Sequence, residues 1–137
     1  MREPHLQYSD EEFRKKFELL ELPPEVITHE AHFRIVWVYL KALDFDTSLQ
    51  KVVEGIKKFD QKFGRGAKYH ATISYDYMQI FGKKMEHQPY LDWAEFIFEN
   101  EDMLKPVKDV LLKYYKEETL FSERAKREFL EPDLNPF

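Results

Sequence analysis

The stretch Thr28–Leu43, which reads THEAHFRIVWVYLKAL, decides the fold. Its apolar side chains recur with the i, i+3, i+4, i+7 spacing of one helix face, at Phe33, Val36, Trp37 and Leu40. Further apolar residues between these positions leave the segment apolar nearly all round, which is typical of a helix at the centre of a bundle. We therefore predict a central helix over this stretch, with Thr28 as its N-cap and Trp37 buried.

The segments on either side also carry helix signals. Ser9 and Glu12 have the spacing of a capping box, and Leu22-Pro23-Pro24 is expected to end the first helix because the residue before a proline avoids helical geometry. After a turn at residues 44–47, apolar residues from Leu49 to Phe63 mark a third helix, which Gly64-Arg65-Gly66 is expected to end. Four more helices are predicted downstream: from about Lys68 to Lys84, a short one capped by Asp92, Lys105–Tyr115 and Glu123–Leu130.

This pattern predicts an all-α protein, a compact bundle of five to seven helices that forms a single domain over residues 1–137. Residues 1–8 are expected to form a polar arm. Residues 131–137 contain two prolines and are therefore expected to form an extended tail. The tip of this tail is apolar, so we expect Leu134 or Phe137 to pack onto the bundle or onto a partner chain.

The composition argues against several classes of function. The 137 residues include no cysteine, which excludes disulfides, thiol nucleophiles and zinc fingers held by this chain alone. A balance of 21 Lys and Arg against 26 Asp and Glu, a net charge of −5, argues against nucleic-acid binding. No apolar run approaches the roughly 18 residues of a membrane span. The first five residues lack the apolar segment of a signal peptide, so we expect a cytoplasmic location.

Three histidines are the strongest candidates for chemistry. His29 and His32 lie three residues apart at the start of the central helix and therefore share one face, and His70 opens the fourth helix. Because alternate helices of an up-down bundle begin at the same end, we predict that the three rings converge. We also expect burial beside Phe33 and Ile73 to keep the rings neutral, since desolvation disfavours the charged form.

Such a cluster allows three interpretations. Three neutral imidazoles can hold a divalent metal ion with open coordination positions. Without a metal, the histidines can act as general acid and base, because imidazole titrates near neutral pH. In the structural interpretation, each ring satisfies a backbone group inside the protein. The sequence leaves all three open.

Three motifs carry a resemblance. His29–Leu40 matches H-x-x-H-[LF]-R-[VI]-[AV]-W-x-[YL]-L, and Tyr69–Ser74 matches Y-H-x-T-[IL]-[ST]. Residues 114–133 match YY…L-x-S-x-x-A-[RK]-x-x-F-x-x-P-D. With these motifs, in this order over roughly residues 27–134, the chain resembles a family of small uncharacterised bacterial proteins that has no established activity. The resemblance implies a bacterial protein and marks seven recurrent positions: His29, His32, Arg34, Trp37, Tyr69, His70 and Thr72.

Two hypotheses of function follow. In the first, the protein is an enzyme or a ligand- or metal-binding protein for a small molecule, with His29, His32 and His70 as catalytic residues or metal ligands. Binding residues would then be Tyr69 and Thr72 beside the histidines, Arg34 for an anionic group, and Trp37 among the aromatic surroundings. In the alternative, the protein is a non-catalytic interaction or structural module in which the histidines are satisfied internally. An aromatic surface would then pair two copies as a homodimer.

Overall fold

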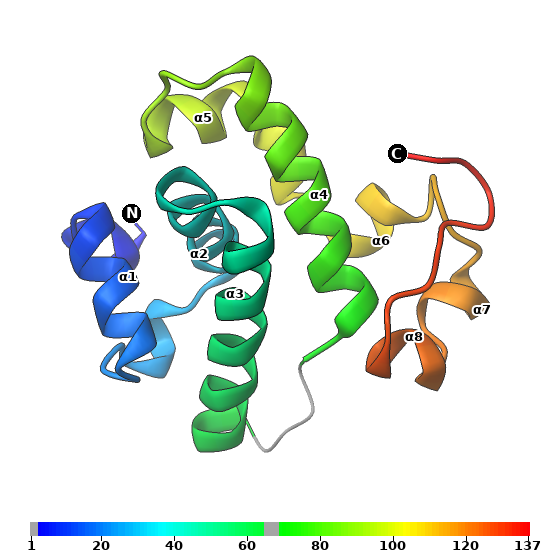
Figure 1. Cartoon of the computed structure of the whole chain (residues 1–137), viewed down its shortest axis with the longest axis horizontal. Helices are drawn as coiled ribbons and strands as arrows, with labels where there is room; N and C mark the ends of the chain where they lie inside the picture. The colour runs from blue at the N-terminus through cyan, green and yellow to red at the C-terminus, as the bar shows by residue number, and fades with distance from the viewer. Residues whose placement is uncertain (1–2, 65–68) are drawn as a thin grey trace. The chain divides into compact units, whose positions relative to one another are not determined.

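The computed structural model describes residues 3–64 and 69–137, and within these ranges it contains eight α-helices and no strand (Figure 1). The predicted all-α fold is confirmed. None of the described helices is long and apolar enough to cross a membrane. The chain divides into two compact units, Met1–Tyr69 and His70–Phe137, whose positions relative to one another are not determined. Each unit is therefore described by itself, and the single-domain organisation stays a prediction.

The N-terminal unit is built around the predicted central helix. Helix α2, His29–Ala42, packs against α1, Asp10–Glu18, and against α3, Phe45–Phe59. Trp37 is 2 % exposed, so the prediction that this helix is buried is confirmed. The core around it consists of apolar side chains from all three helices and the α1–α2 connection: Phe13, Phe17, Leu22, Val26, Phe33, Ile35, Val36, Val38, Tyr39 and Val52.

The predicted caps of this unit are observed, but two helix boundaries differ. Ser9 and Glu12 form the capping box of α1, and the Thr28 hydroxyl accepts the N–H of Ala31 at the start of α2. Helix α1 ends at Glu18, before the prolines, because Leu20 takes a left-handed conformation with φ 57° that turns the chain out of the helix. Helix α3 begins at Phe45, earlier than expected, because the Asp44 carboxylate caps it through the N–H of Thr47.

The third helix was expected to end at Gly64-Arg65-Gly66. Instead, a π-helical turn, Asp60–Gly64, continues directly from the helix. Arg65 and Gly66 of the predicted stop signal lie outside the described residues. This turn places Asp60 inside the unit, where only 6 % of the residue is exposed.

The C-terminal unit consists of one long helix and several short ones. Helix α4 spans Ala71–His87, followed by α5, Trp93–Glu99, and a 3-10 turn, Glu101–Leu104. Three short helices complete the unit: α6 over Val107–Leu111, α7 over Glu117–Leu120 and α8 over Glu123–Arg127. Helix α4 packs against α8 (Figure 1). The helix predicted from about Lys68 to Lys84 is observed as α4.

Several predicted boundaries of this unit were wrong. The fourth helix starts at Ala71, not near residue 68, because His70 is extended and acts as its N-cap. The sixth helix covers Val107–Leu111 instead of Lys105–Tyr115, and α7 was not predicted. Helix α8 ends at Arg127 instead of Leu130, because the N–H of Leu130 donates to the Thr72 hydroxyl at 3.1 Å and not to a carbonyl of its own helix.

The C-terminal tail is docked within this unit. The N–H of Leu134 donates to the carbonyl of Tyr114 at 2.9 Å, and the Asn135 amide donates to the carbonyl of Lys113 at 2.8 Å. The Phe137 ring lies 4.8 Å from the Tyr114 ring, centroid to centroid. The expectation that the apolar tip of the tail packs onto the protein is therefore confirmed.

Candidate functional site

A pocket of about 90 Å³ lies within the N-terminal unit, among α1, α2, α3 and the π-helical turn. Most of its wall is apolar: Phe17, Pro24, Ile27, Ile35, Ile56, Phe59 and Phe63. Two polar side chains also line it, His32 from α2 and Asp60 from the π-helical turn. An apolar wall with few polar groups is the usual character of a small-molecule site, but this pocket is smaller than the typical range of about 300–1,000 Å³. Single π-helical turns also occur frequently at functional sites.

The two polar residues of this pocket differ in burial. Asp60 is buried, and its Oδ2 accepts the backbone N–H of Tyr69 at 3.4 Å. His32 is exposed and therefore lies where the pocket meets solvent. Phe63, in the π-helical turn, also lines the pocket and is partly exposed. The pocket thus has a buried acceptor in its wall and a titratable ring at its opening.

The predicted burial of His29 and His32 was wrong, since both residues are exposed. The His29 ring packs edge-on against the ring of the buried Phe33, with centroids 4.7 Å apart, and this contact leaves His29 exposed. Apolar neighbours in the sequence do not bury a residue in the first turn of a helix, where solvent reaches the helix end. Water therefore has access to both rings, and no internal partner is required to satisfy them.

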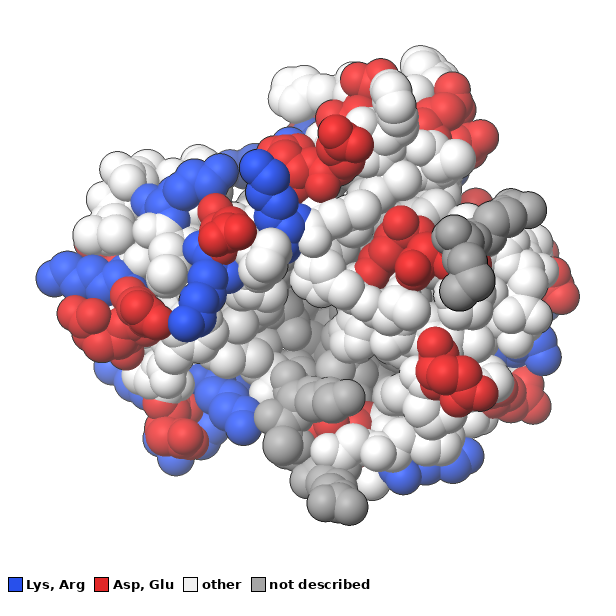
Figure 2. All heavy atoms as spheres, turned by 180° about the vertical axis from the view of Figure 1, so that it is seen from behind, with Lys and Arg blue, Asp and Glu red and all other residues white. Residues whose placement is uncertain are grey.

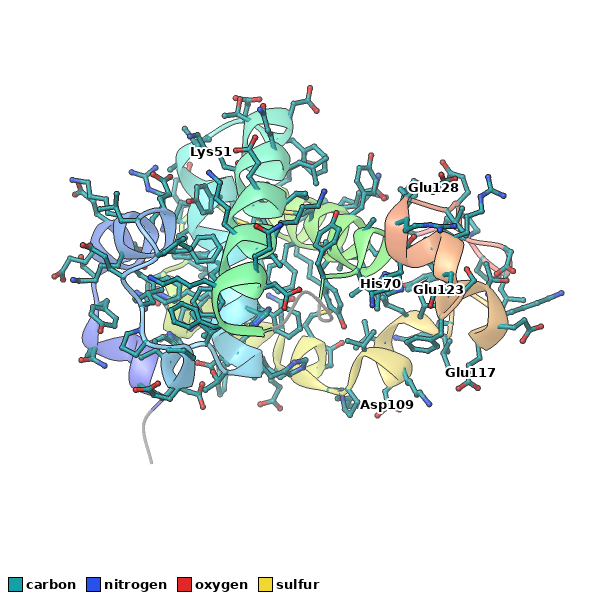
Figure 3. The ribbon with its side chains drawn as sticks, turned by 90° about the horizontal axis from the view of Figure 1, so that it is seen from below. Lys51, His70, Asp109, Glu117, Glu123 and Glu128 are labelled. Atoms are coloured by element: carbon teal, nitrogen blue, oxygen red, sulfur yellow. The ribbon has the colours of Figure 1, made fainter. Side chains whose placement is uncertain are left out.

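His70 belongs to the C-terminal unit, where its side chain connects the start of α4 to α7. Figure 3 labels His70 at the start of α4. Its Nδ1 accepts the N–H of Ile73 at 3.1 Å, which caps α4, and its Nε2 lies 2.9 Å from the carbonyl oxygen of Leu120. A carbonyl only accepts, so Nε2 carries the proton and the ring is the neutral Nε2–H tautomer. Burial lowers the pKa of His70, which also favours the neutral form. To bind a metal, His70 would have to give up one of these two hydrogen bonds.

Thr72, the other polar residue of the Y-H-x-T segment, has a similar role. Its buried hydroxyl lies 2.7 Å from the carbonyl of Ala125 and 2.9 Å from that of Glu128, and it accepts the N–H of Leu130. Tyr69 belongs to the N-terminal unit, where the Lys57 ammonium lies 4.9 Å from the centre of its ring. The convergence of His29, His32 and His70 stays a prediction, because the first two belong to one unit and His70 to the other.

Arg34 is buried and serves the N-terminal arm. Its Nη1 donates to the carbonyl of His5 at 2.7 Å, and its Nη2 donates to the carbonyl of Tyr8 and to Oδ1 of Asp10, both at 2.9 Å. An external anion at Arg34 would have to compete with the Asp10 carboxylate. Trp37 is buried beneath the ammonium group of Lys41, which lies 4.5 Å from its ring centroid.

The N-terminal arm holds a polar cluster that sequence reasoning missed. His5 is fully buried, and its Nε2 lies 2.5 Å from Oε2 of Glu30 and 3.8 Å from Oε1 of Glu3. The hydroxyl of Thr28 also donates to Glu3. The expected polar arm is therefore a packed segment, anchored to the first turn of α2. His5 lies outside any apolar repeat, so the sequence pattern does not predict its burial. Only the structure shows its contacts with Glu3 and Glu30.

The Glu3–His5–Glu30 cluster has the composition of a metal site, but its hydrogen bonds favour a structural role. Its three ligand atoms lie within 4.8 Å of one another. However, Nη1 of Arg34 lies 3.3 Å from Nδ1 of His5, and a guanidinium only donates. Nδ1 is therefore the acceptor, and Nε2 carries the proton that it donates to Glu30. A metal at Nε2 would have to displace this proton while Arg34 occupies the other nitrogen.

Comparisons with protein-family models, curated proteins and solved structures found no match to this chain. The resemblance to a family of small bacterial proteins stays a prediction. Its motifs nonetheless have a physical account in the C-terminal unit: Ser122 caps α8, Ala125 is buried, and the Asp133 carboxylate accepts the N–H of Lys116 and the hydroxyl of Thr119 at the start of α7.

Proposed function

We propose that the protein binds a small, mostly apolar molecule that carries one hydroxyl or amine group, in the pocket of the N-terminal unit. One observation carries this proposal: a mostly apolar pocket of about 90 Å³ that the buried residue Asp60 helps to line. An engineered apolar cavity of about 150 Å³ binds benzene. A pocket of about 90 Å³ that opens beside His32 therefore admits part of a ring or a branched chain, with the remainder at the surface.

The charge of the pocket selects the polar group of the ligand. A buried carboxylate attracts a cation or a hydrogen-bond donor, and it repels another carboxylate in a medium of low dielectric constant. Asp60 therefore favours an amine or a hydroxyl over an acid. The His32 ring at the opening can contact the ligand.

Three probes of equal size test this selection: benzylamine, benzyl alcohol and benzoate. We expect benzylamine and benzyl alcohol to shift the backbone NMR signals of Ile35, Ile56 and Phe59, and benzoate to leave them unchanged. Replacing Ile56→Trp, which fills the pocket, should abolish the shifts. His29→Leu is the matched control for His32→Leu, because His29 lies one turn earlier on α2 and does not line the pocket.

The result that would refute this function is equal binding of all three probes, or equal effects of His29→Leu and His32→Leu. If the Asp60→Asn variant no longer binds benzylamine but still binds benzyl alcohol, the preference for a cationic ligand is due to Asp60. Unfolding curves of each variant show whether it is still folded.

A second candidate function is the interaction module, and exposed aromatic residues favour it. Tyr90 is 94 % exposed and Phe98 is 75 % exposed, and both belong to the segment around α5. We propose that this surface pairs two copies of the chain. Sedimentation velocity should then show a dimer that Tyr90→Ser with Phe98→Ser dissociates, while Leu19→Ser, an exposed position in the other unit, has no effect. A monomer at all concentrations would exclude it.

We propose a cytoplasmic bacterial protein, as the sequence and its resemblance imply. Metal binding by the three histidines is proposed only for a form in which His70 releases one of its two hydrogen bonds.

A further inference from the structure

A cavity in the C-terminal unit has a different character from the pocket described above. It encloses about 410 Å³ and is lined by residues of α4, the 3-10 turn, α6 and the segment after α6. Its apolar part includes Ile80 and the buried side chains of Met103 and Val110. The volume is within the range of about 300–1,000 Å³ that is typical of small-molecule sites.

Three lysines from three separate segments line this cavity: Lys84 on α4, Lys105 after the 3-10 turn and Lys113 after α6. Lys84 is half-buried. Over residues 3–64 and 69–137 the structure shows no ion pair for Lys84 or Lys113. Lysines brought together in this way raise the local potential and attract anions.

The three lysines of the cavity lie in a unit whose net charge is negative. The C-terminal unit carries nine Lys and Arg residues against fourteen Asp and Glu residues, so it accounts for the net charge of −5 of the chain. Figure 2 nevertheless shows basic side chains gathered on one part of the visible face, around an acidic group. Asp102 and Asp109 also line the cavity, so its three ammonium groups exceed its carboxylates by one.

We propose that this cavity binds a small organic phosphate, with the phosphate on the lysines and the organic part on the apolar wall. A phosphate has three oxygens that can accept from three ammonium groups, whereas a carboxylate has two oxygens in one plane. Ile80, Met103 and Val110 supply the surface that an organic group would cover. This inference concerns another unit and another ligand chemistry than the proposed function, so either can fail alone.

Calorimetric titration of the full chain with phenyl phosphate tests the proposal, with phenol and inorganic phosphate as the two halves of the probe. We expect phenyl phosphate to bind most tightly, with phenol at least about tenfold weaker and an affinity that falls as salt is raised. Lys84→Gln should weaken binding about tenfold, because it removes one charge-assisted hydrogen bond. Lys83→Gln is the matched control, an exposed neighbour on the same helix that does not line the cavity.

Lys113→Gln is a second variant at an exposed position, so its fold should be unaffected even if Lys84→Gln does not fold. It should weaken binding several-fold. The proposal is overturned if phenyl phosphate does not bind, if phenol binds as tightly as phenyl phosphate, or if Lys83→Gln weakens binding as much as Lys84→Gln and Lys113→Gln. The last result would indicate attraction by overall charge and not a site.

Discussion

The hydroxyl of Tyr115 has one proton and two acceptors. It lies 2.9 Å from Oδ1 of Asp76 and 2.7 Å from the carbonyl oxygen of Leu130. Both contacts are satisfied if Asp76 is protonated, since the carboxyl group then donates to Tyr115 and Tyr115 donates to Leu130. Burial raises the pKa of Asp76 to about 7 against the lowering effect of the Tyr115 hydrogen bond, and the charge of Glu131 adds to the rise. A pKa of about 7 keeps Asp76 protonated in the folded state at pH values well below 7, where this hydrogen-bond arrangement holds.

This arrangement predicts a pH dependence of stability. The pKa of Asp76 is higher in the folded chain than its ordinary value of 3.8, so the folded state binds the proton more tightly. The stability that this provides is complete below pH 4 and is lost as the pH rises to about 7. Relative to Asp76→Asn, which does not titrate, the free energy of unfolding of the wild type should fall by about 1.4 kcal/mol per pH unit within this window.

Urea unfolding of both proteins from pH 4 to pH 8 measures this difference. Because all other carboxyl groups are shared, their contributions cancel when the two curves are subtracted. A difference that stays constant across the window would show that Asp76 is ionised in the folded state, and the assignment of the Tyr115 proton would fail with it.

For single residues, the sequence identified the histidines as candidate functional residues, but it did not predict whether each one is buried or exposed. Spacing along a helix places His29 and His32 on one face, yet it does not report that solvent reaches that face. His5 and Asp76 were missed because a single polar residue has no periodic signal of its own. Their significance arises from partners 25 and 39 residues away, Glu30 and Tyr115, which no local pattern reveals.

At the scale of elements, local signals predicted the longer helices well. Ser9, Thr28 and Asp92 cap helices as expected, because a cap depends on residues within one turn, and Ser122 caps α8 in the same way. The four-residue helix α7 was missed because Lys116 at its N-cap supplies no side-chain cap. The Asp133 carboxylate, 17 residues later, accepts the N–H of Lys116 instead. Such a helix depends on tertiary contacts and has little signal of its own.

The close approach of α1 and α3 yields a prediction at this scale. A Cβ atom at Gly55 of α3 would lie 2.3 Å from Cε2 and 2.7 Å from Cζ of the buried Phe17 ring. Alanine is favoured over glycine in a helix by about 1 kcal/mol, but the clash outweighs this gain. Gly55→Ala should therefore lower the free energy of unfolding by about 1–2 kcal/mol, as overpacking of a core usually does.

A double-mutant cycle separates the clash from other effects. In the background of Phe17→Leu, which removes the ring, Gly55→Ala should be neutral or stabilising. A loss of the same size in both backgrounds would mean that the glycine is needed for a reason other than the Phe17 contact. Stabilisation by Gly55→Ala in the wild-type background would contradict the packing directly.

At the scale of the whole molecule, the sequence predicted the fold class because helical periodicity is a local property. It did not predict the division into two compact units, since no linker composition separates Tyr69 from His70. Each unit has its own apolar core and one buried tryptophan, Trp37 in the first and Trp93 in the second. These tryptophans can report on the two units separately.

The predicted single domain requires that the two units unfold together, and size supports this expectation. A domain of about 70 residues rarely gains more than about 3–5 kcal/mol from one core, so neither unit alone is expected to be very stable. With Trp93→Phe as background, fluorescence reports only Trp37. Phe81→Leu in the core of the other unit should then move the Trp37 unfolding midpoint to lower urea by about 0.5 M, since such a swap costs about 1 kcal/mol.

Val52→Ala provides the matched control, because Val52 is buried in the same unit as Trp37 and must shift its midpoint in any case. The reciprocal experiment uses Trp37→Phe as background, so that Trp93 reports the effect of Val52→Ala across the chain. If Phe81→Leu leaves the Trp37 midpoint unchanged while Val52→Ala moves it, the units unfold independently and the chain has two domains. Cooperative unfolding requires that both substitutions shift both signals, because a single transition has one free energy for every probe.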